Sequence, residues 1–221
     1  VGLGGSGFPT YVKYQKDAEL ILINGCECEP YLTTDQVVSP TKTDLLVKGI
    51  KILMKAANAN KAMVAIKKGK PHLHEALVAA FENEENIDVV EVADVYPVGW
   101  ERVLIRKVLR KEYDKLPNEV GVVVNNIQTA IAAADALLNG NAITSRVVTV
   151  SGNAVSRVGN FEVPVGTVAG SLIEYLGGYT EENVILLAGG PMTSKGQMND
   201  KFILERQTGG LTVLKHIEVK S

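Results

Sequence analysis

The 221-residue chain lacks several features that would assign it to a particular class of protein. Its apolar runs have the length of strands, well short of the roughly 20 residues that a membrane-spanning helix needs, and we see no signal peptide. The formal net charge of -2 excludes the basic surface typical of nucleic-acid-binding domains. Only two cysteines are present, Cys26 and Cys28, too few and too close for the disulfide framework of a secreted domain. These absences favour a globular protein of a reducing, cytoplasmic compartment.

The composition, the length and the first residues indicate what kind of chain this is. Hydrophobic residues make up 46% of the chain and charged residues 22%, which is ordinary for a packed core with a solvated surface. The length leaves room for one large domain or two modest ones. The chain starts at Val1 rather than at a methionine, and a glycine-rich run follows at once. We therefore expect it to be part of a longer protein.

Strand-like and helix-like segments alternate over the first 140 residues. Short, apolar, β-rich segments predict strands at residues 18–24, 61–68, 87–92 and 121–126. Apolar residues at helical spacing predict helices at residues 41–58, 71–84, 100–110 and 127–140. Thr41 or Thr43 is a suitable N-cap for the first helix. Pro71 suits the first turn of the second helix, and Gly140 closes the last. The polar stretch 25–35, which follows the first predicted strand, predicts a turn.

This alternation predicts an α/β domain, a Rossmann-like and mainly parallel sheet with helices on both faces. Such sheets bind ligands beyond the carboxyl ends of their strands. Unusual residues follow three of the predicted strands: Asn24 after the first, residues 96–99 after the third, and Asn125 with Asn126 at the end of the fourth. We expect these residues to gather at one edge of the sheet.

The pattern changes near residue 144. Short strands, glycine-rich turns and a single helix predict a small α+β domain of the β-grasp kind: a hairpin, a helix and further strands. We place the boundary near Ala142, which gives domains at residues 1–141 and 142–221.

The glycine-rich run itself matches neither of two common phosphate-binding patterns. It precedes the first predicted strand instead of following it, so it is not the dinucleotide-binding fingerprint, and no Gly-Lys-Ser/Thr follows it. What remains is backbone that can approach a flat or anionic ligand closely, with Lys13 to meet a phosphate.

Four motifs in a fixed order narrow the interpretation. They are GLGGSGFPTYVK (residues 2–13), NGCECEPY (24–31), YPVGWERVLI (96–105) and VVNNIQT (123–129). Together they resemble the flavin-binding domain shared by the C subunit of the Rnf electron-transport complex and the NADH-binding flavoprotein subunit of respiratory complex I, with the Rnf-type branch the closer one. Residues 147–167 and 188–196 resemble the soluble-ligand-binding β-grasp (SLBB) domain that follows it in this family.

The resemblance implies an electron-transfer flavoprotein module that binds FMN and oxidises NADH. Electrons would pass to iron–sulfur clusters in parts of the parent protein outside this chain, or to a partner protein or complex subunit. The parent would act in the cytoplasm or at the periphery of a membrane complex. The residues that match the family's cofactor-binding positions are Gly4, Gly5, Gly7, Phe8, Lys13, Asn24, Glu27, Glu29, Gly99, Glu101, Asn125 and Asn126.

The resemblance also implies roles within this set. The loop glycines would let backbone pack on the flavin, Lys13 would contact the flavin, and Glu29 would lie near the nicotinamide nucleotide. Asn125 and Asn126 would lie near the flavin phosphate. No catalytic side chain and no metal ligand are implied, because the flavin itself performs the redox chemistry.

Two positions depart from the family and leave other interpretations open. Cys26 stands where complex I has an aspartate, so flavin binding is expected to be weaker or differently arranged, and Trp100 stands where it has the first of two glutamates. The alternative is a non-catalytic ligand- or partner-binding module with a degenerate flavin site. Asn125 and Asn126 also suit a helix cap, and the Cys26/Cys28 pair suits a structural role, or a redox or metal-binding one, although it supplies only two of the four ligands that zinc takes.

Overall fold

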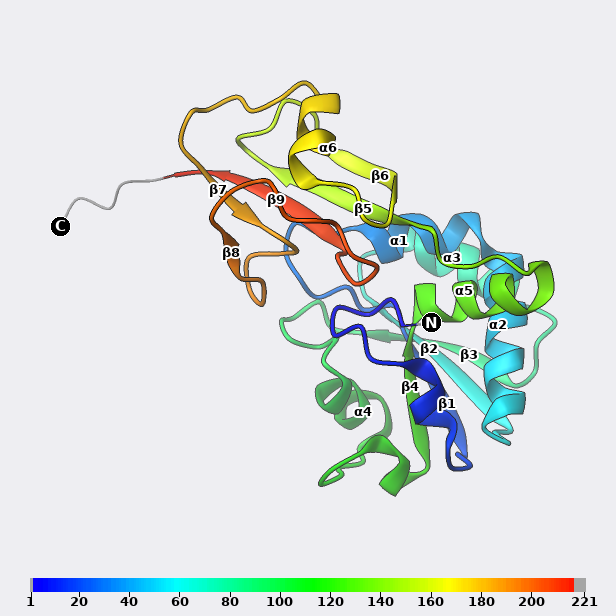
Figure 1. The fold of residues 1–221 in the computed structure, drawn as a ribbon. Coiled ribbons are helices and arrows are strands. Elements are labelled where there is room, and N and C mark those ends of the chain that lie inside the picture. Colours follow the sequence, from blue (N-terminus) through cyan, green and yellow to red (C-terminus); the bar gives the residue numbers. More distant parts are fainter. Residues whose placement is uncertain (1, 217–221) are drawn as a thin grey trace. The chain divides into compact units, whose positions relative to one another are not determined.

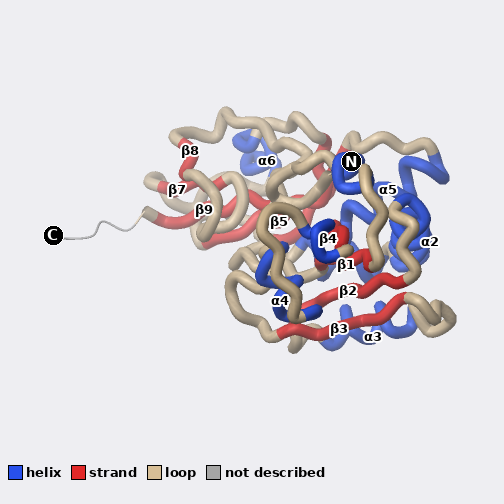
Figure 2. The backbone as a smooth tube through the Cα atoms, turned by 90° about the horizontal axis from the view of Figure 1, so that it is seen from below, coloured by secondary structure: helices blue, strands red, loops and turns tan. Residues whose placement is uncertain are grey.

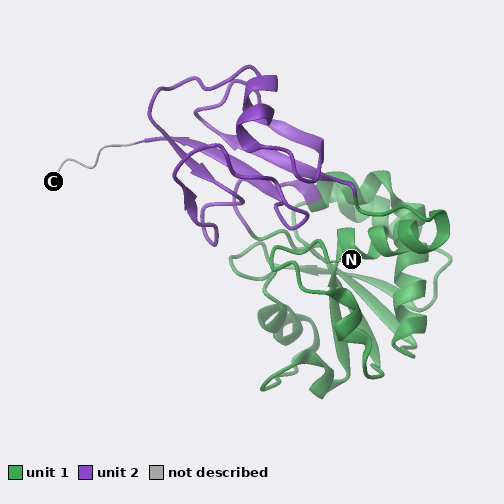
Figure 3. Ribbon diagram, in the orientation of Figure 1, with its two compact units in different colours: residues 1–28, 35–143 green, residues 29–34, 144–221 purple. Residues whose placement is uncertain are grey.

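The computed structural model describes residues 2–216 and divides the chain into two compact units (Figure 3). Unit 1 comprises Val1–Cys28 and Asp35–Ile143, and unit 2 comprises Glu29–Thr34 and Thr144–Ser221. The segment 29–34 therefore belongs with unit 2, although its neighbours in sequence on both sides belong to unit 1. We keep the boundary between residues 141 and 142 as a proposal about domains and use the two units for description.

Unit 1 is built on four parallel strands. They are β1 (Leu20–Asn24), β2 (Lys61–Lys67), β3 (Ile87–Val92) and β4 (Val122–Asn126). Their order along the sheet is β3-β2-β1-β4, so the chain runs outward from β1 and returns to its other side (Figure 2). At the carboxyl edge, Asn24 of β1 is in register with Ala65 on one side and Asn126 on the other. The register places the asparagine-rich ends of β1 and β4 side by side.

Helices cover both faces of this sheet (Figure 1). The helices of unit 1 are α1 (Thr34–Thr41), α2 (Thr43–Ala56), α3 (Pro71–Ala80), α4 (Glu101–Leu109) and α5 (Ile127–Asn139), with 3₁₀ turns η1 (Thr10–Tyr14) and η2 (Pro117–Val120). Leu104 and Ile105 of α4 form one apolar cluster with the side chains of Leu20, Leu22 and Val124. On the opposite face α2 packs against α5. The predicted Rossmann-like sheet with helices on both faces is confirmed.

Close packing of α2 on α5 depends on a glycine. A Cβ atom added at Gly49 would lie 2.0 Å from the backbone oxygen of Ala130. Since protein interiors are packed as densely as organic crystals, no larger residue fits between these helices without moving one of them.

Unit 2 is a five-stranded mixed sheet with one helix. Its elements are β5 (Ser145–Gly152), β6 (Gly159–Pro164), α6 (Ala169–Tyr175), β7 (Val184–Leu187), β8 (Gly196–Gln197) and β9 (Gly210–Lys215). The order is β6-β5-β9-β7-β8; β5 and β9 are parallel and the other pairs antiparallel. Leu172 and Ile173 of α6 pack into the core with Val148, Val150 and Val213. The predicted hairpin, helix and following strands are present.

Two local predictions were wrong. Residues 34–41 form helix α1, although Thr34 and Asp35 were assigned to a turn. The polar Asp35 side chain is bonded inside the protein, where it accepts from Gln128 Nε2. The N-cap of α2 is Lys42, and its side chain makes no capping bond. In unit 2, the backbone of residues 202–204 pairs with residues 166–169: Leu204 N–H donates to Thr167 O at 2.8 Å. Pro71 and Gly140 do lie at the helix ends predicted for them.

No helix among residues 2–216 combines the length and the apolar character that crossing a membrane would require.

Candidate functional site

The glycine-rich loop is a folded turn held against the start of α5. Gly7 N–H donates to Gly4 O at 2.8 Å, and Gly7 has a φ of 59°, a left-handed conformation that suits glycine. The backbone N–H of Leu3 donates to Thr129 Oγ1 at 3.0 Å, which ties the loop to α5. Nothing lies within 4 Å of a Cβ added at Gly5. This backbone is therefore open to a ligand at Gly5.

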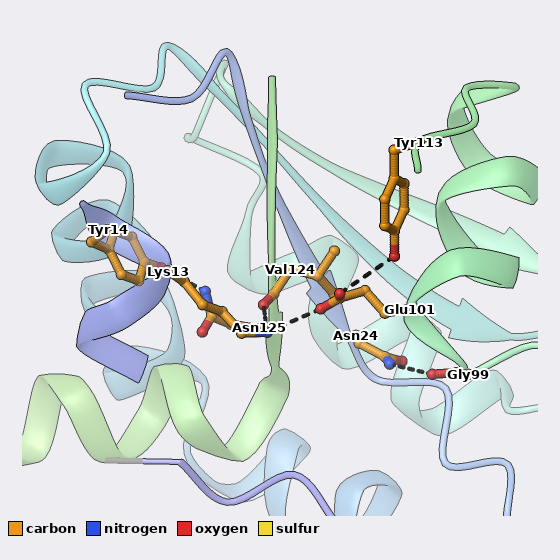
Figure 4. Close-up of polar contacts among 8 residues, drawn as sticks. All are labelled: Lys13, Tyr14, Asn24, Gly99, Glu101, Tyr113, Val124 and Asn125. Carbon is orange, nitrogen blue, oxygen red and sulfur yellow. Dashed lines mark hydrogen bonds and ion pairs between the residues drawn. The ribbon is translucent and has the colours of Figure 1, made fainter. Parts of the chain in front are cut away.

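Lys13 reaches from η1 to the middle of β4. Its Nζ donates to Val124 O at 2.7 Å and forms an ion pair with Glu101 Oε2 at 3.0 Å (Figure 4). The ring centroid of Phe8, from the glycine-rich loop, lies 5.7 Å from the same Nζ, within the range of a cation–π contact. The ammonium group is thus fixed by three parts of unit 1 that are far apart in sequence.

A cavity of about 280 Å³ borders this ion pair. Its lining residues are Ser6, Phe8, Val12, Lys13, Glu101, Leu116, Pro117, Asn118, Val122 and Val124. Apolar side chains dominate the wall, and the two charges are the strongest polar groups on it. Such a mixture, mostly apolar with a few well-placed polar groups, is typical of small-ligand sites.

Glu101 has a second partner on the other side of its carboxylate. It begins α4, and Tyr113 OH lies 3.5 Å from Glu101 Oε1. The Arg102 guanidinium lies over the ring of Tyr113, 4.4 Å from its centroid, and also donates to Tyr113 O. Burial raises the pKa of Tyr113, and the Glu101 charge raises it further. The phenol therefore stays protonated and can donate to the carboxylate.

Asn24, at the end of β1, ties two loops together. Its Nδ2 donates to Gly99 O at 2.7 Å, and its Oδ1 accepts the backbone N–H of Cys26 at 3.0 Å. A Cβ added at Gly99 would lie 2.2 Å from Cys26 O, so the loops are in close contact there. Asn24 and Gly99 are brought together as expected from their places after β1 and β3, but both are used in holding this contact.

Cys26 is buried, and burial raises the pKa of its thiol to about 12, with nearby Lys67 lowering it in part. Cys26 and Cys28 do not form a disulfide with each other. A thiol with so high a pKa is a poor nucleophile near neutral pH. Among residues 2–216, no three histidine, cysteine or acidic side chains are grouped as metal ligands would be. The geometry favours a structural role for Cys26.

The two asparagines at the end of β4 have different partners. Asn125 Nδ2 donates to Tyr14 OH at 2.5 Å, and the pKa of Tyr14 is raised by burial, which the bond from Asn125 offsets in part. Asn126 is the N-cap of α5: its Oδ1 accepts the N–H groups of Gln128 and Thr129, at 3.0 and 3.3 Å. The capping role considered for this pair therefore applies to Asn126.

A buried carboxylate lies beside that cap. Asp35, 6% exposed, accepts from Asn126 Nδ2 at 2.9 Å and from Gln128 Nε2 at 2.6 Å. Its backbone N–H donates to Glu27 Oε2 at 3.1 Å. Sequence reasoning missed Asp35, and only its position next to the start of an unpredicted helix could have drawn attention to it.

Glu27 and Glu29, two residues apart, belong to different units. Glu27 receives the Asp35 N–H in unit 1. Glu29 lies in unit 2, where it accepts the Met192 N–H at 3.1 Å and the Thr193 hydroxyl. Within unit 1 the structure thus brings together Phe8, Lys13 and Glu101 with the glycine-rich loop, while Asn24 with Gly99 and Asn126 with Asp35 form two further clusters.

Comparisons with known proteins identify the family of the chain. The family model of the Nuo51 FMN-binding domain matches residues 1–135, and that of the SLBB domain matches residues 147–195. The chain belongs to the Nuo51 FMN-binding domain family. The family predicted from the motifs is confirmed.

Two curated relatives match almost the whole chain. The C subunit of the proton-translocating ferredoxin:NAD(+) oxidoreductase complex of Clostridium ljungdahlii is 39% identical over 98% of this chain and 49% of its own length. The corresponding subunit of the Na(+)-translocating complex of Acetobacterium woodii is 33% identical over 97% of this chain and 50% of its length. The chain spans about half the length of these relatives.

A solved structure supports the fold. A chain of an NAD+-reducing [NiFe]-hydrogenase in the air-oxidized state superposes with a TM-score of 0.77 at 23% identity, covering 96% of this chain and 44% of that one.

Proposed function

We propose that the chain is an electron-transfer module that binds FMN in unit 1 and takes a hydride from NADH. One observation carries the proposal: the glycine-rich loop, Lys13 of η1, Val124 of β4 and Glu101 of α4 converge on one apolar-walled cavity in a chain of the FMN-binding family. The convergence lies on the same side of the sheet as α4, beside strand β4.

The residues present fit a flavin in kind. Gly5 leaves backbone open, Phe8 and Val124 offer apolar contact, and Lys13 offers a cation for a phosphate or a ring carbonyl. The cavity volume of about 280 Å³ lies near the lower end of small-ligand sites, roughly 300 Å³. Any part of the flavin that does not fit in the cavity would lie against the open loop at Gly5.

A bound flavin would supply the conversion between two-electron and one-electron transfer. The protein's part is to bind, to orient and to exclude water. Lys13, held by Val124 O, places a fixed positive charge; Phe8, Val12 and Leu116 keep the wall apolar, which strengthens that charge's interactions. Hydride transfer needs no general acid or base, so the absence of a histidine from the cavity lining is consistent with this chemistry.

We propose that electrons leave to iron–sulfur clusters or to a partner outside this chain, at the periphery of a membrane complex. The support is that the two relatives are subunits of ion-translocating ferredoxin:NAD(+) oxidoreductase complexes. The names of these complexes pair ferredoxin with NAD(+), which supports NAD(H) as the nicotinamide partner, and we propose NADH as the hydride donor for electrons that leave in this direction.

The test is the visible absorption spectrum of the protein after reconstitution with FMN and removal of free flavin. We expect a yellow protein whose flavin bands bleach when NADH is added without oxygen. A yellow protein that does not bleach would remove NADH from the proposal and leave flavin binding.

A second candidate is a binding module whose flavin site no longer works. The internal bonds of Asn24 and Asn126 favour it, because the amides that the resemblance assigned to the flavin are used within the protein. A colourless protein that gains no thermal stability from FMN would decide for this candidate, since a ligand of the native state must stabilise it.

A further inference from the structure

In the ion pair at the cavity wall, the carboxylate already occupies the cation that an anionic ligand would bind. Lys13 is the only positively charged residue that lines the cavity in the part of the chain the structure describes, and Glu101 Oε2 lies 3.0 Å from it. Both side chains are partly exposed, Lys13 by 25% and Glu101 by 35%. A ligand oxygen that approaches Lys13 therefore approaches a carboxylate as well.

We propose that Glu101 competes with the ligand for Lys13 and limits the affinity of the site for groups that carry negative charge. The inference rests on the proposed function and deepens it, because it makes Glu101 a specificity-determining residue of the same site. The ligand class is one that presents a phosphate or another strong acceptor to Lys13.

The start of α4 and Tyr113 hold the Glu101 carboxylate in place. It lies in the first turn of the nine-residue helix α4, where an acid is favoured by the helix dipole. Tyr113 OH faces its other oxygen, and Arg102 holds the Tyr113 ring. A ligand that takes Lys13 thus leaves Glu101 with Tyr113 and the helix terminus, so displacement needs no large movement of the carboxylate.

The size of the effect follows from the exposure of the pair. Partly exposed ion pairs are weak, and the apolar wall strengthens them only moderately. We expect Glu101→Gln to tighten FMN binding about two- to fivefold. Glu101→Asp, which keeps the charge, should bind within about twofold of the parent.

The experiment measures FMN and riboflavin binding by equilibrium dialysis, in four proteins that form a cycle: parent, Glu101→Gln, Lys13→Met and the double variant. Glu112→Gln is the matched control, because it removes the same charge from an exposed side chain of unit 1 that pairs with Arg106 and does not line the cavity. It should leave both affinities unchanged.

The proposal predicts that Glu101→Gln increases the free energy of FMN binding in the Lys13→Met background by no more than half of what it adds in the parent. A gain for FMN alone would assign the phosphate to Lys13, and an equal gain for riboflavin would assign a ring oxygen. An unchanged or weaker affinity of Glu101→Gln, or the same gain in both backgrounds, would overturn the competition, since a structural role would not depend on Lys13.

Failure of the proposed function looks different. If neither the parent nor any variant binds FMN, that function is wrong, and inorganic pyrophosphate then becomes the probe. Tighter pyrophosphate binding by Glu101→Gln than by the parent would support the competition on its own, and equal or weaker binding would refute it.

Discussion

Charged side chains of unit 1 lie beside a cavity next to β4, whereas the polar side chains of unit 2 lie along the mixed sheet and bond to one another. In unit 1, Lys13 and Glu101 remain partly exposed beside a cavity. In unit 2, Ser151 faces Thr212 at 3.2 Å inside the core, and Thr212 donates to Gly189 O. The partly exposed charges beside a cavity are the reason why we propose the ligand site in unit 1.

The turn of residues 26–29 makes the same contrast over a shorter distance. Glu27 caps the start of α1 in unit 1, and Glu29 holds the turn at Met192 and Thr193 in unit 2. A Cβ added at Gly190 would lie 2.3 Å from Glu29 Oε2. One motif thus supplies two structural contacts, and the role at the nicotinamide that the resemblance gave to Glu29 stays a prediction.

The largest expected effects come from two glycine substitutions, each of which destabilises one of the two units. In Gly49→Ala the new Cβ would lie 2.0 Å from Ala130 O in unit 1; in Gly152→Ala it would lie 1.9 Å from Val213 O in unit 2, at a φ of 111°. Overpacking of this kind costs about 3 kcal/mol, which urea unfolding would measure. Gly49→Ala should weaken FMN binding, because it displaces α5, whose Thr129 holds the glycine-rich loop, whereas Gly152→Ala should keep FMN affinity.

Gly196→Ala is the control for this pair, since nothing lies within 4 Å of its added Cβ. It should unfold like the parent. Equal loss of FMN affinity in Gly49→Ala and Gly152→Ala would contradict the assignment of the site to one unit.

Lys13→Ala sharpens the comparison at the site itself. A hydrogen bond to a charged group contributes about 1.5–3 kcal/mol, so we expect FMN affinity to fall about 10- to 100-fold in equilibrium dialysis. Lys16→Ala, an exposed lysine two residues beyond η1, should bind like the parent. FMN bound as tightly by Lys13→Ala as by the parent would show that the cation is not part of the site.

Cys26 gives unit 1 a pH dependence. Its thiol pKa is raised from 9.0 to about 12 in the folded protein, so the folded state keeps a proton that the unfolded state releases. Its contribution to stability is complete below about pH 9 and is lost as pH rises toward 12. Cys26→Ala should flatten the fall in unfolding free energy above pH 9 by up to about 1.4 kcal/mol per pH unit.

Urea unfolding at several alkaline pH values would measure this slope, with Cys28→Ala as the control. An unaltered slope in Cys26→Ala would mean that the thiol is not buried as described.

The smallest expected effect tests unit 2. Glu29→Ala and Thr193→Val each remove one side of the same contact, so each should lower the unfolding free energy by about 1 kcal/mol. The double variant should lose less than the sum, because the two residues act as a pair. Both single variants should bind FMN like the parent. Weaker FMN binding by Glu29→Ala alone would mean that Glu29 contributes to the ligand site.

Much of unit 1 could be predicted from the sequence because its strands are short apolar runs separated by amphipathic helices. The convergence of Lys13 with Glu101 followed from the resemblance, but their ion pair did not, since 88 residues separate them. Asp35 and Tyr14 were missed because their partners, Asn126 and Asn125, lie far along the chain at the end of β4. In unit 2, β8 has two residues, too few for any periodic signal.

The most direct test of the central claim maps where FMN binds. Backbone amide NMR shifts recorded during an FMN titration should change most at the glycine-rich loop, at Lys13 and at the ends of β1 and β4. Shifts confined to unit 2, for example around the open hollow of about 500 Å³ lined by Tyr179, Asp200 and His216, would contradict the claim.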